Sequence, residues 1–146
     1  MKILTKQVEI LIVEDNEGDI RLIEEVFEEA KIRNRLHIAE DGEEAMLFLH
    51  GKGKFAGSPR PYVIILDLNL PKKDGREVLR EIKEDGNLKN IPVIVLTTSN
   101  SEKDILGAYG LRANAYITKP LDFNQFLTVV ESIVNFWLEI VKLQSK

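Results

Sequence analysis

The chain of 146 residues contains no cysteine and only two histidines, His37 and His50. Disulfide bonds, cysteine-ligated metal centres and thiol catalysis are therefore excluded, and a metal site built from several histidines is out of reach. Uninterrupted apolar runs do not exceed five residues, too few for a membrane-spanning helix or for the apolar core of a signal peptide. We therefore expect a cytoplasmic protein that does not enter a membrane.

The sequence also lacks the excess of basic charge that nucleic-acid binding requires. It has 20 basic and 24 acidic residues, interleaved along the chain, for a formal net charge of −4. A nucleic-acid partner is not expected, because a protein that binds nucleic acid must present a basic face. With 44% hydrophobic and 30% charged residues, the composition is typical of one globular domain. We expect residues 1–146 to form this single domain, without an output domain.

What the sequence does contain is an alternation of short runs of Ile, Val and Leu with helical patterns. Continuous apolar runs are typical of strands buried on both faces of a parallel sheet. The runs predict strands at residues 8–13, 35–39, 62–66, 91–96 and 113–118. Helical periodicity follows each of them, over about 20–30, 43–49, 78–82, from Ser101 onward, and over about 122–143. The alternation predicts an α/β fold, a doubly wound five-stranded parallel sheet with helices on both faces.

Polar side chains stand directly after four of these predicted strands, at the sheet edge where doubly wound folds bind ligands. They are Glu14 and Asp15, Asp67 and Asn69, the hydroxyls of residues 97–99, and Lys119 followed by Pro120. Carboxylates brought together repel one another and need a cation, and a set of oxygen ligands favours Mg²⁺. A carboxylate beside a metal and a lysine can attack a phosphoryl group as a nucleophile.

Taken singly, each residue has an ordinary structural role. An aspartate after a strand commonly caps a helix, so Asp15 alone would predict an N-cap. A threonine at a strand end and a lysine before a proline are unremarkable surface features. The joint occurrence at four strand ends favours the functional interpretation.

In order and spacing, these residues resemble the response-regulator receiver domains of two-component signalling, over almost the whole chain. The resemblance implies a flavodoxin-like sheet of strand order 2-1-3-4-5 and a phosphoryl group accepted from a sensor histidine kinase. The resemblance implies that Asp67 is the phosphoacceptor, and that the Mg²⁺ ligands are Glu14, Asp15, Asp67 and the Asn69 carbonyl. It implies switch and phosphate-binding roles for Thr97, Tyr116 and Lys119, and a cis bond before Pro120. It also implies that Asn69 and Ser99 tune dephosphorylation.

A finer resemblance concerns the segments 66–71 and 116–120 and the long loop at 51–61, which are similar to small single-domain regulators of phytochrome-type histidine kinases. One departure from the family pattern is Arg112, which stands where a glycine is common, with Gly110 two residues earlier. The departure concerns the turn after the fourth predicted helix and not the phosphorylation site.

Three alternatives use a similar fold. A haloacid-dehalogenase-type phosphatase needs an acid two residues after its nucleophile, where this chain has Asn69. A flavodoxin-like cofactor binder needs a phosphate loop after the first strand, where Glu14 and Asp15 would repel phosphate. A pseudo-receiver would lack part of the site.

The final predicted helix, at about 122–143, carries two apolar stripes where a helix lying on a sheet needs one. The inward stripe consists of Phe126, Val130, Val134, Trp137 and Val141, and the second of Val129, Ile133, Phe136 and Ile140. An uncovered stripe predicts a homodimer through the surface of the fourth helix, fifth strand and fifth helix, which phosphorylation would bias if the interface includes the fifth strand. The alternative is that the helix bends back and the domain's own loops bury the second stripe.

Overall fold

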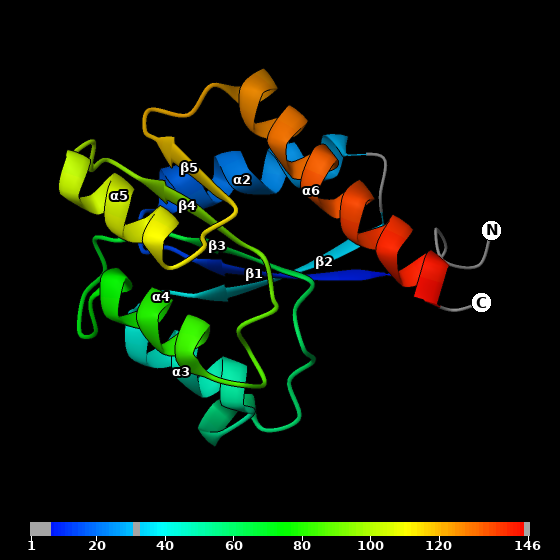
Figure 1. The fold of residues 1–146 in the computed structure, drawn as a ribbon, viewed down its shortest axis with the longest axis horizontal. Coiled ribbons are helices and arrows are strands. Elements are labelled where there is room, and N and C mark those ends of the chain that lie inside the picture. The colour runs from blue at the N-terminus through cyan, green and yellow to red at the C-terminus, as the bar shows by residue number, and fades with distance from the viewer. Residues whose placement is uncertain (1–6, 31–32, 145–146) are drawn as a thin grey trace.

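The computed structural model describes residues 7–30 and 33–144 and places five parallel strands in the order β2-β1-β3-β4-β5. The strands are β1 (Val8–Val13), β2 (Asn34–Ala39), β3 (Val63–Leu66), β4 (Val93–Thr97) and β5 (Ala115–Thr118). The helices are α2 (Glu17–Glu29), α3 (Gly42–His50), α4 (Gly75–Glu84), α5 (Glu102–Gly110) and α6 (Phe123–Gln144) (Figure 1). The predicted fold class and strand order are confirmed.

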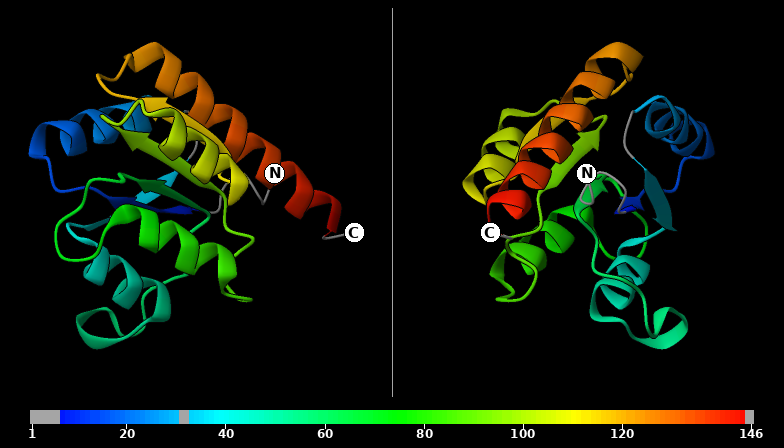
Figure 2. Two further views of the ribbon diagram at one scale, coloured as in Figure 1. Left: turned by 60° about the vertical axis from the view of Figure 1, so that its left-hand side comes forward. Right: turned by 90° about the vertical axis from the view of Figure 1, so that its right-hand side faces the viewer.

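Helices cover both faces of the sheet, as Figure 2 shows from two further directions. Side chains of β1, β3 and β4 alternate between the two faces, so every residue of these strands except Glu9 and Thr97 belongs to an apolar core. In β1, for example, Leu11 and Val13 pack with α3 and α4, whereas Ile10 and Ile12 pack with α2 and α6. Burial on both faces explains why these strands read as continuous apolar runs.

Some predicted strand boundaries are wrong by one or two residues. Three strands begin later than predicted, at Val63, Val93 and Ala115, while β2 begins one residue earlier. The strand β4 cannot extend back to Ile91, because Pro92 has no N–H to donate to a neighbouring strand. The start of β5 is delayed by the turn after α5.

In that turn, Arg112 has a φ of 66°, in the left-handed region that glycine adopts more easily. Its N–H donates to the Tyr109 carbonyl oxygen at 2.9 Å, and the N–H of Ala113 donates to the Ala108 carbonyl oxygen at 3.0 Å. The arginine thus takes the left-handed conformation that glycine adopts more easily, and the two hydrogen bonds close the turn.

Polar side chains cap the starts of the five helices α2 to α6, with Asp74 before α4 and Asp122 before α6 among them. The Asp41 carboxylate accepts from the Glu44 N–H at 2.8 Å, and the Ser101 hydroxyl accepts from the Asp104 N–H at 3.1 Å. At the start of α2 the cap is Asn16, whose side-chain oxygen accepts from the Asp19 N–H at 2.9 Å. Asp15 is therefore not the N-cap, which leaves its carboxylate available for another role.

The final helix α6 ends one residue beyond its predicted end. Phe126 and Val130 are buried as predicted, but Val129 and Ile133, assigned to the second stripe, are partly buried against the same core. The expectation of an uncovered stripe is therefore wrong for these two residues, because the domain itself covers them in part. The remaining stripe residues lie outside the described side chains: Val134, Phe136, Trp137, Ile140 and Val141. Within the described residues, we find no helix with the length and apolarity needed to cross a bilayer.

Candidate functional site

The carboxyl ends of β1 and β3 bring three carboxylates together. Oxygens of Glu14, Asp15 and Asp67 all lie within 4.8 Å of one another. Glu14 and Asp67 are buried, with 2% and 6% of their surface exposed, whereas Asp15 is exposed. The predicted convergence of these residues is therefore seen in the structure, because β1 and β3 are neighbours in the sheet.

Glu14 lies in surroundings that disfavour its charged form. Its Oε2 accepts hydrogen bonds from the N–H groups of Asp15 and Asn16, both at 3.2 Å. Burial is the largest cause and raises the pKa of Glu14 to about 7; the hydrogen bond from Lys119 lowers the pKa, and the neighbouring Asp67 charge raises it to a smaller extent. The cluster therefore has an oxygen donor set and a surplus of negative charge, which together suit a divalent cation.

The Lys119 ammonium lies among these carboxylates. Its Nζ donates to Glu14 Oε1 at 2.7 Å, to Asp19 Oδ2 at 2.6 Å and to Asp67 Oδ2 at 3.2 Å. Burial lowers the pKa of Lys119, but the hydrogen bonds to Asp19 and Glu14 outweigh this and raise the pKa above its usual range. Lys119 is thus a fixed positive charge next to Asp67. The peptide bond that joins it to Pro120 is cis, as the resemblance implied.

Asp19 is a part of the site that the sequence interpretation missed. It lies in the first turn of α2, four residues after Asp15, and reaches Lys119 from a helix and not from a strand end. A signal was present, since Asp19 follows Asp15 by only four residues and lies in the first turn of the next helix. That spacing alone is too common to single out the residue.

Asn69 connects the end of β3 to the hydroxyls at the end of β4. Its backbone N–H donates to Asp67 Oδ1 at 3.0 Å. Its side-chain Nδ2 donates to Thr97 Oγ1 at 3.3 Å and to Thr98 Oγ1 at 3.1 Å. Thr97 is fully buried. Asn69 thus contacts the Asp67 carboxylate through its backbone and the Thr97 hydroxyl through its side chain, and both of these groups were selected from the sequence.

Ser99 and Tyr116 continue this arrangement toward β5. The backbone N–H of Ser99 donates to Thr97 Oγ1 at 3.3 Å, and the Tyr116 hydroxyl donates to the Ser99 carbonyl oxygen at 2.8 Å. The loop of residues 97–99 therefore links Thr97 to Tyr116 through the backbone of Ser99. Beside this loop, Arg76 and Asp104, two more residues that the sequence interpretation did not select, form an ion pair.

Comparisons with known proteins agree with this site. A family model described as the response regulator receiver domain matches residues 10–131. "Response regulator Rcp1" of Synechocystis sp. is 51% identical over 134 residues, which cover 92% of this chain and 91% of that protein. The chain belongs to the family of response-regulator receiver domains, in which phosphorylation of an aspartate is general. Its role is therefore in signalling, and the phosphatase and flavodoxin-like alternatives are excluded.

Two solved structures are similar over almost their whole length. The Mn²⁺-bound form of response regulator Rcp1 has a TM-score of 0.80 and 50% identity, and covers 90% of this chain and 95% of that chain. The phosphorylated cyanobacterial phytochrome response regulator RcpA has a TM-score of 0.80 and 49% identity, and covers 91% and 95%. Receiver domains bind a divalent metal, and the cluster of Glu14, Asp15 and Asp67 has the donor set for one.

Proposed function

We propose that the chain accepts a phosphoryl group on Asp67 from a sensor histidine kinase and signals through protein–protein contacts. The observation that carries this proposal is the environment of the Asp67 carboxylate. One of its oxygens lies 3.2 Å from the Lys119 ammonium, while the other is fixed by the Asn69 N–H. The carboxylate is therefore oriented, and a cation stands ready to neutralise an incoming phosphoryl group.

In the transfer, an Asp67 oxygen attacks the phosphorus of a phosphohistidine, an O–P bond forms, the N–P bond breaks, and the histidine leaves with the electron pair. Lys119 binds a phosphoryl oxygen and stabilises the developing negative charge. Glu14, Asp15, Asp67 and the Asn69 carbonyl would hold Mg²⁺, which when bound supplies further positive charge to the phosphoryl oxygens. Asn69 and Ser99 line the path of the water that later hydrolyses the acyl phosphate.

The phosphoryl group is then sensed by the Thr97 hydroxyl. When Thr97 turns toward the phosphoryl oxygens, its hydrogen bond with the Ser99 N–H changes, and the loop of residues 97–99 moves with it. Because the Tyr116 hydroxyl donates to the Ser99 carbonyl, this movement releases the tyrosine to turn inward. The surface formed by α5, β5 and α6 is thereby biased between two states.

The proposed partner is a phytochrome-type histidine kinase, in the cytoplasm. Support comes from RcpA, described as a cyanobacterial phytochrome response regulator and 49% identical to this chain. The bacteriophytochrome response regulator RtBRR is 37% identical, with a TM-score of 0.78. A measurement that distinguishes partners is the rate of phosphoryl transfer from phytochrome-type and unrelated kinase cores under the same conditions. Equal rates from both would contradict this choice of partner.

The proposal includes a homodimer through the surface of α5, β5 and α6. Support comes from two large apolar side chains on α5: Leu106 is 62% exposed and Tyr109 is 49% exposed. Exposed apolar residues grouped on one helix are typical of an interaction surface. We expect light scattering to show a dimer at micromolar concentration and a folded monomer for Leu106→Glu. A wild-type monomer, both with and without a phosphodonor, would contradict the dimer.

The phosphorylation site is tested with Mg²⁺, acetyl phosphate and intact-mass measurement. We expect the wild type to gain one phosphoryl group and Asp67→Asn to gain none, because asparagine keeps the size but removes the nucleophile. Asp122→Asn is the matched control, since Asp122 accepts from the Gln125 N–H at the start of α6 and asparagine preserves such a cap. Phosphoryl uptake by Asp67→Asn, or none by the wild type, would overturn the proposal.

A further inference from the structure

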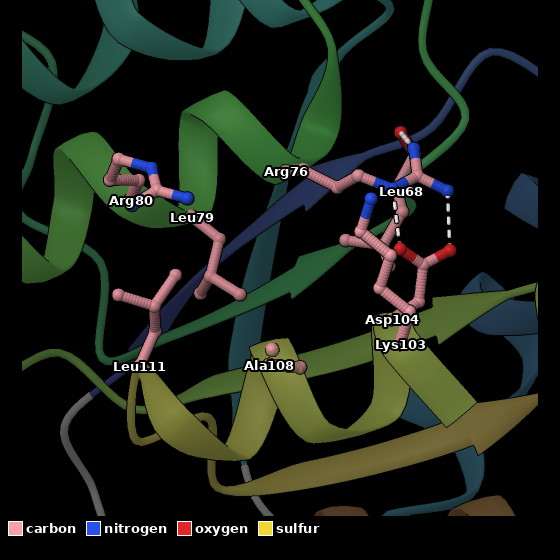
Figure 3. Close-up of a pocket in the computed structure, with 9 residues that line it drawn as sticks. Leu68, Arg76, Leu79, Arg80, Lys103, Asp104, Ala108 and Leu111 are labelled. Atoms are coloured by element: carbon pink, nitrogen blue, oxygen red, sulfur yellow. Dashed lines mark hydrogen bonds and ion pairs between the residues drawn. The ribbon is translucent and has the colours of Figure 1, made fainter. Parts of the chain in front are cut away.

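Arg76 near the start of α4 and Asp104 near the start of α5 form a two-pronged ion pair. Arg76 Nε donates to Asp104 Oδ1 at 2.7 Å, and Nη2 donates to Oδ2 at 2.6 Å, as the dashed lines in Figure 3 show. Arg76 Nη1 also donates to the Leu68 carbonyl oxygen at 3.2 Å, next to the phosphoacceptor position. Paired hydrogen bonds between a guanidinium and a carboxylate are strong and directional, so the pair defines a geometry.

Each member of the pair also contacts a residue that lines the candidate site. The Ser99 hydroxyl donates to Asp104 Oδ2 at 2.6 Å, and Arg76 Nη2 lies 3.5 Å from Asn69 Oδ1, to which it donates. These contacts orient the side chains of Ser99 and Asn69. The Asn69 oxygen faces Arg76, so its Nδ2 is left to donate to Thr97 and Thr98. Asn69 and Ser99 are therefore held by the same ion pair.

The ion pair joins the two helices beside an open space. A cavity of about 280 Å³ lies between α4 and α5, lined in part by Leu79, Ala108 and Leu111, with the ion pair at one end (Figure 3). The hydrogen bonds from Arg76 and Ser99 hold the pKa of Asp104 well below its usual range, so the pair remains charged at neutral pH. Polar contacts therefore fix the positions of the Arg76 and Asp104 side chains.

We propose that the Arg76–Asp104 ion pair positions Asn69 and Ser99 across the path of water to the acyl phosphate, and so sets the lifetime of the phosphorylated state. The inference rests on the proposed phosphorylation of Asp67. In the hydrolysis, a water oxygen bonds to phosphorus, the bond from phosphorus to the Asp67 oxygen breaks, and the carboxylate leaves with the electron pair. Inorganic phosphate and one proton are released.

The direction of the effect follows from the contacts. With the pair intact, the Ser99 hydroxyl is engaged by Asp104, and the Asn69 amide by Arg76 and the two threonines. When the pair is broken, both side chains can rotate away and water reaches phosphorus more often. We expect Asp104→Asn and Arg76→Gln to hydrolyse about threefold to tenfold faster than the wild type, the range that corresponds to the loss of one hydrogen bond.

The experiment labels the full chain with acetyl phosphate and Mg²⁺, removes the donor, and follows the decay of the phosphorylated mass with time. Asp104→Asn is measured alone and in a Ser99→Ala background, and Arg76→Gln alone and with Asn69→Ala. The control is Glu81→Gln, which breaks the ion pair between Glu81 of the same helix α4 and Lys73, which precedes the helix. Urea unfolding of every variant measures any general loss of stability.

A positioning role predicts that the effect of Asp104→Asn depends on Ser99. We expect the acceleration to be smaller when Ser99 is already alanine, because only Asn69 can then still be released and residues that act through each other are not additive. The control should decay like the wild type. An unchanged lifetime in the single variants, or the same acceleration in both backgrounds, would overturn the inference. A wild type that takes up no phosphoryl group would instead overturn the proposed function.

Discussion

Gly75 is the first residue of α4, and it lies against the backbone of Asp67, the proposed phosphoacceptor. A Cβ added at Gly75 would come 2.2 Å from the Asp67 carbonyl oxygen and 2.6 Å from the Leu68 Cα. Both are backbone atoms, so neither can rotate away as the end of a flexible side chain would. Gly75→Ala must therefore move the start of α4, the backbone at Asp67, or both, by about 1 Å, which is costly in a packed interior.

Two measurable consequences follow from this displacement. Overpacking of this kind costs about 1–3 kcal/mol of the free energy of unfolding, and the contact with backbone places Gly75→Ala at the upper end. Because a shift of about 1 Å in a reacting group can cost about a hundredfold in rate, phosphoryl uptake should fall by that order. The N–H of Gly75 donates to the Leu68 carbonyl oxygen at 3.0 Å, so the shift reaches the segment that follows Asp67 directly.

The assays are urea unfolding, followed by circular dichroism, and the rate of phosphoryl uptake from acetyl phosphate. Gly107→Ala is the matched control, because Gly107 lies within α5 and an added Cβ meets nothing within 4 Å. There alanine should stabilise the protein by about 0.5–1 kcal/mol through its higher helix propensity. A Gly75→Ala protein with wild-type stability and uptake would refute the reasoning.

Three further predictions concern the charged site and the switch. Because burial raises the pKa of Glu14 to about 7, protons compete with the metal, and Mn²⁺ affinity measured by calorimetry should weaken as the pH falls from about 8 to about 6. Glu14→Gln should flatten that pH profile, and an equally steep profile in this variant would contradict the assignment. Lys119→Ala leaves two buried carboxylates without their cation, so the free energy of unfolding in urea should fall by about 3–5 kcal/mol without metal and should be partly restored by Mg²⁺. A variant as stable as the wild type would show that the lysine is dispensable. Thr97→Ala should still take up phosphate but show no shift in dimer fraction or kinase affinity, and a normal shift would disprove the coupling to Tyr116.

The strand ends could be predicted from the sequence because two simple patterns coincide there. Continuous apolar runs indicate buried parallel strands, and in such a sheet the residue after each run lies at a common edge. Glu14, Asp67 and Lys119 were found in this way, and the structure brings them together. The same reasoning placed strand starts too early, because apolar residues such as Ile91 continue past the point where Pro92 prevents pairing.

Asp19, Arg76 and Asp104 could not be found by these patterns. Each lies on a helix among many other charged residues, where a charge commonly has no role beyond solvation. Their partners are far away in sequence: Asp19 lies 100 residues from Lys119, and Arg76 lies 28 residues from Asp104. Periodicity describes which face of an element is buried and carries no information on which charges meet across elements.

The contacts of Lys119 have a consequence for the synthesis of the chain. The lysine lies 105 residues after Glu14 and 52 after Asp67, and it follows β5, the last strand of the sheet to emerge from the ribosome. Until that strand docks, the acceptor carboxylate has acidic neighbours but no ammonium beside it. Under the proposed function, a nascent chain without β5 is thus a poor substrate for a kinase, and phosphorylation reports that the sheet is complete.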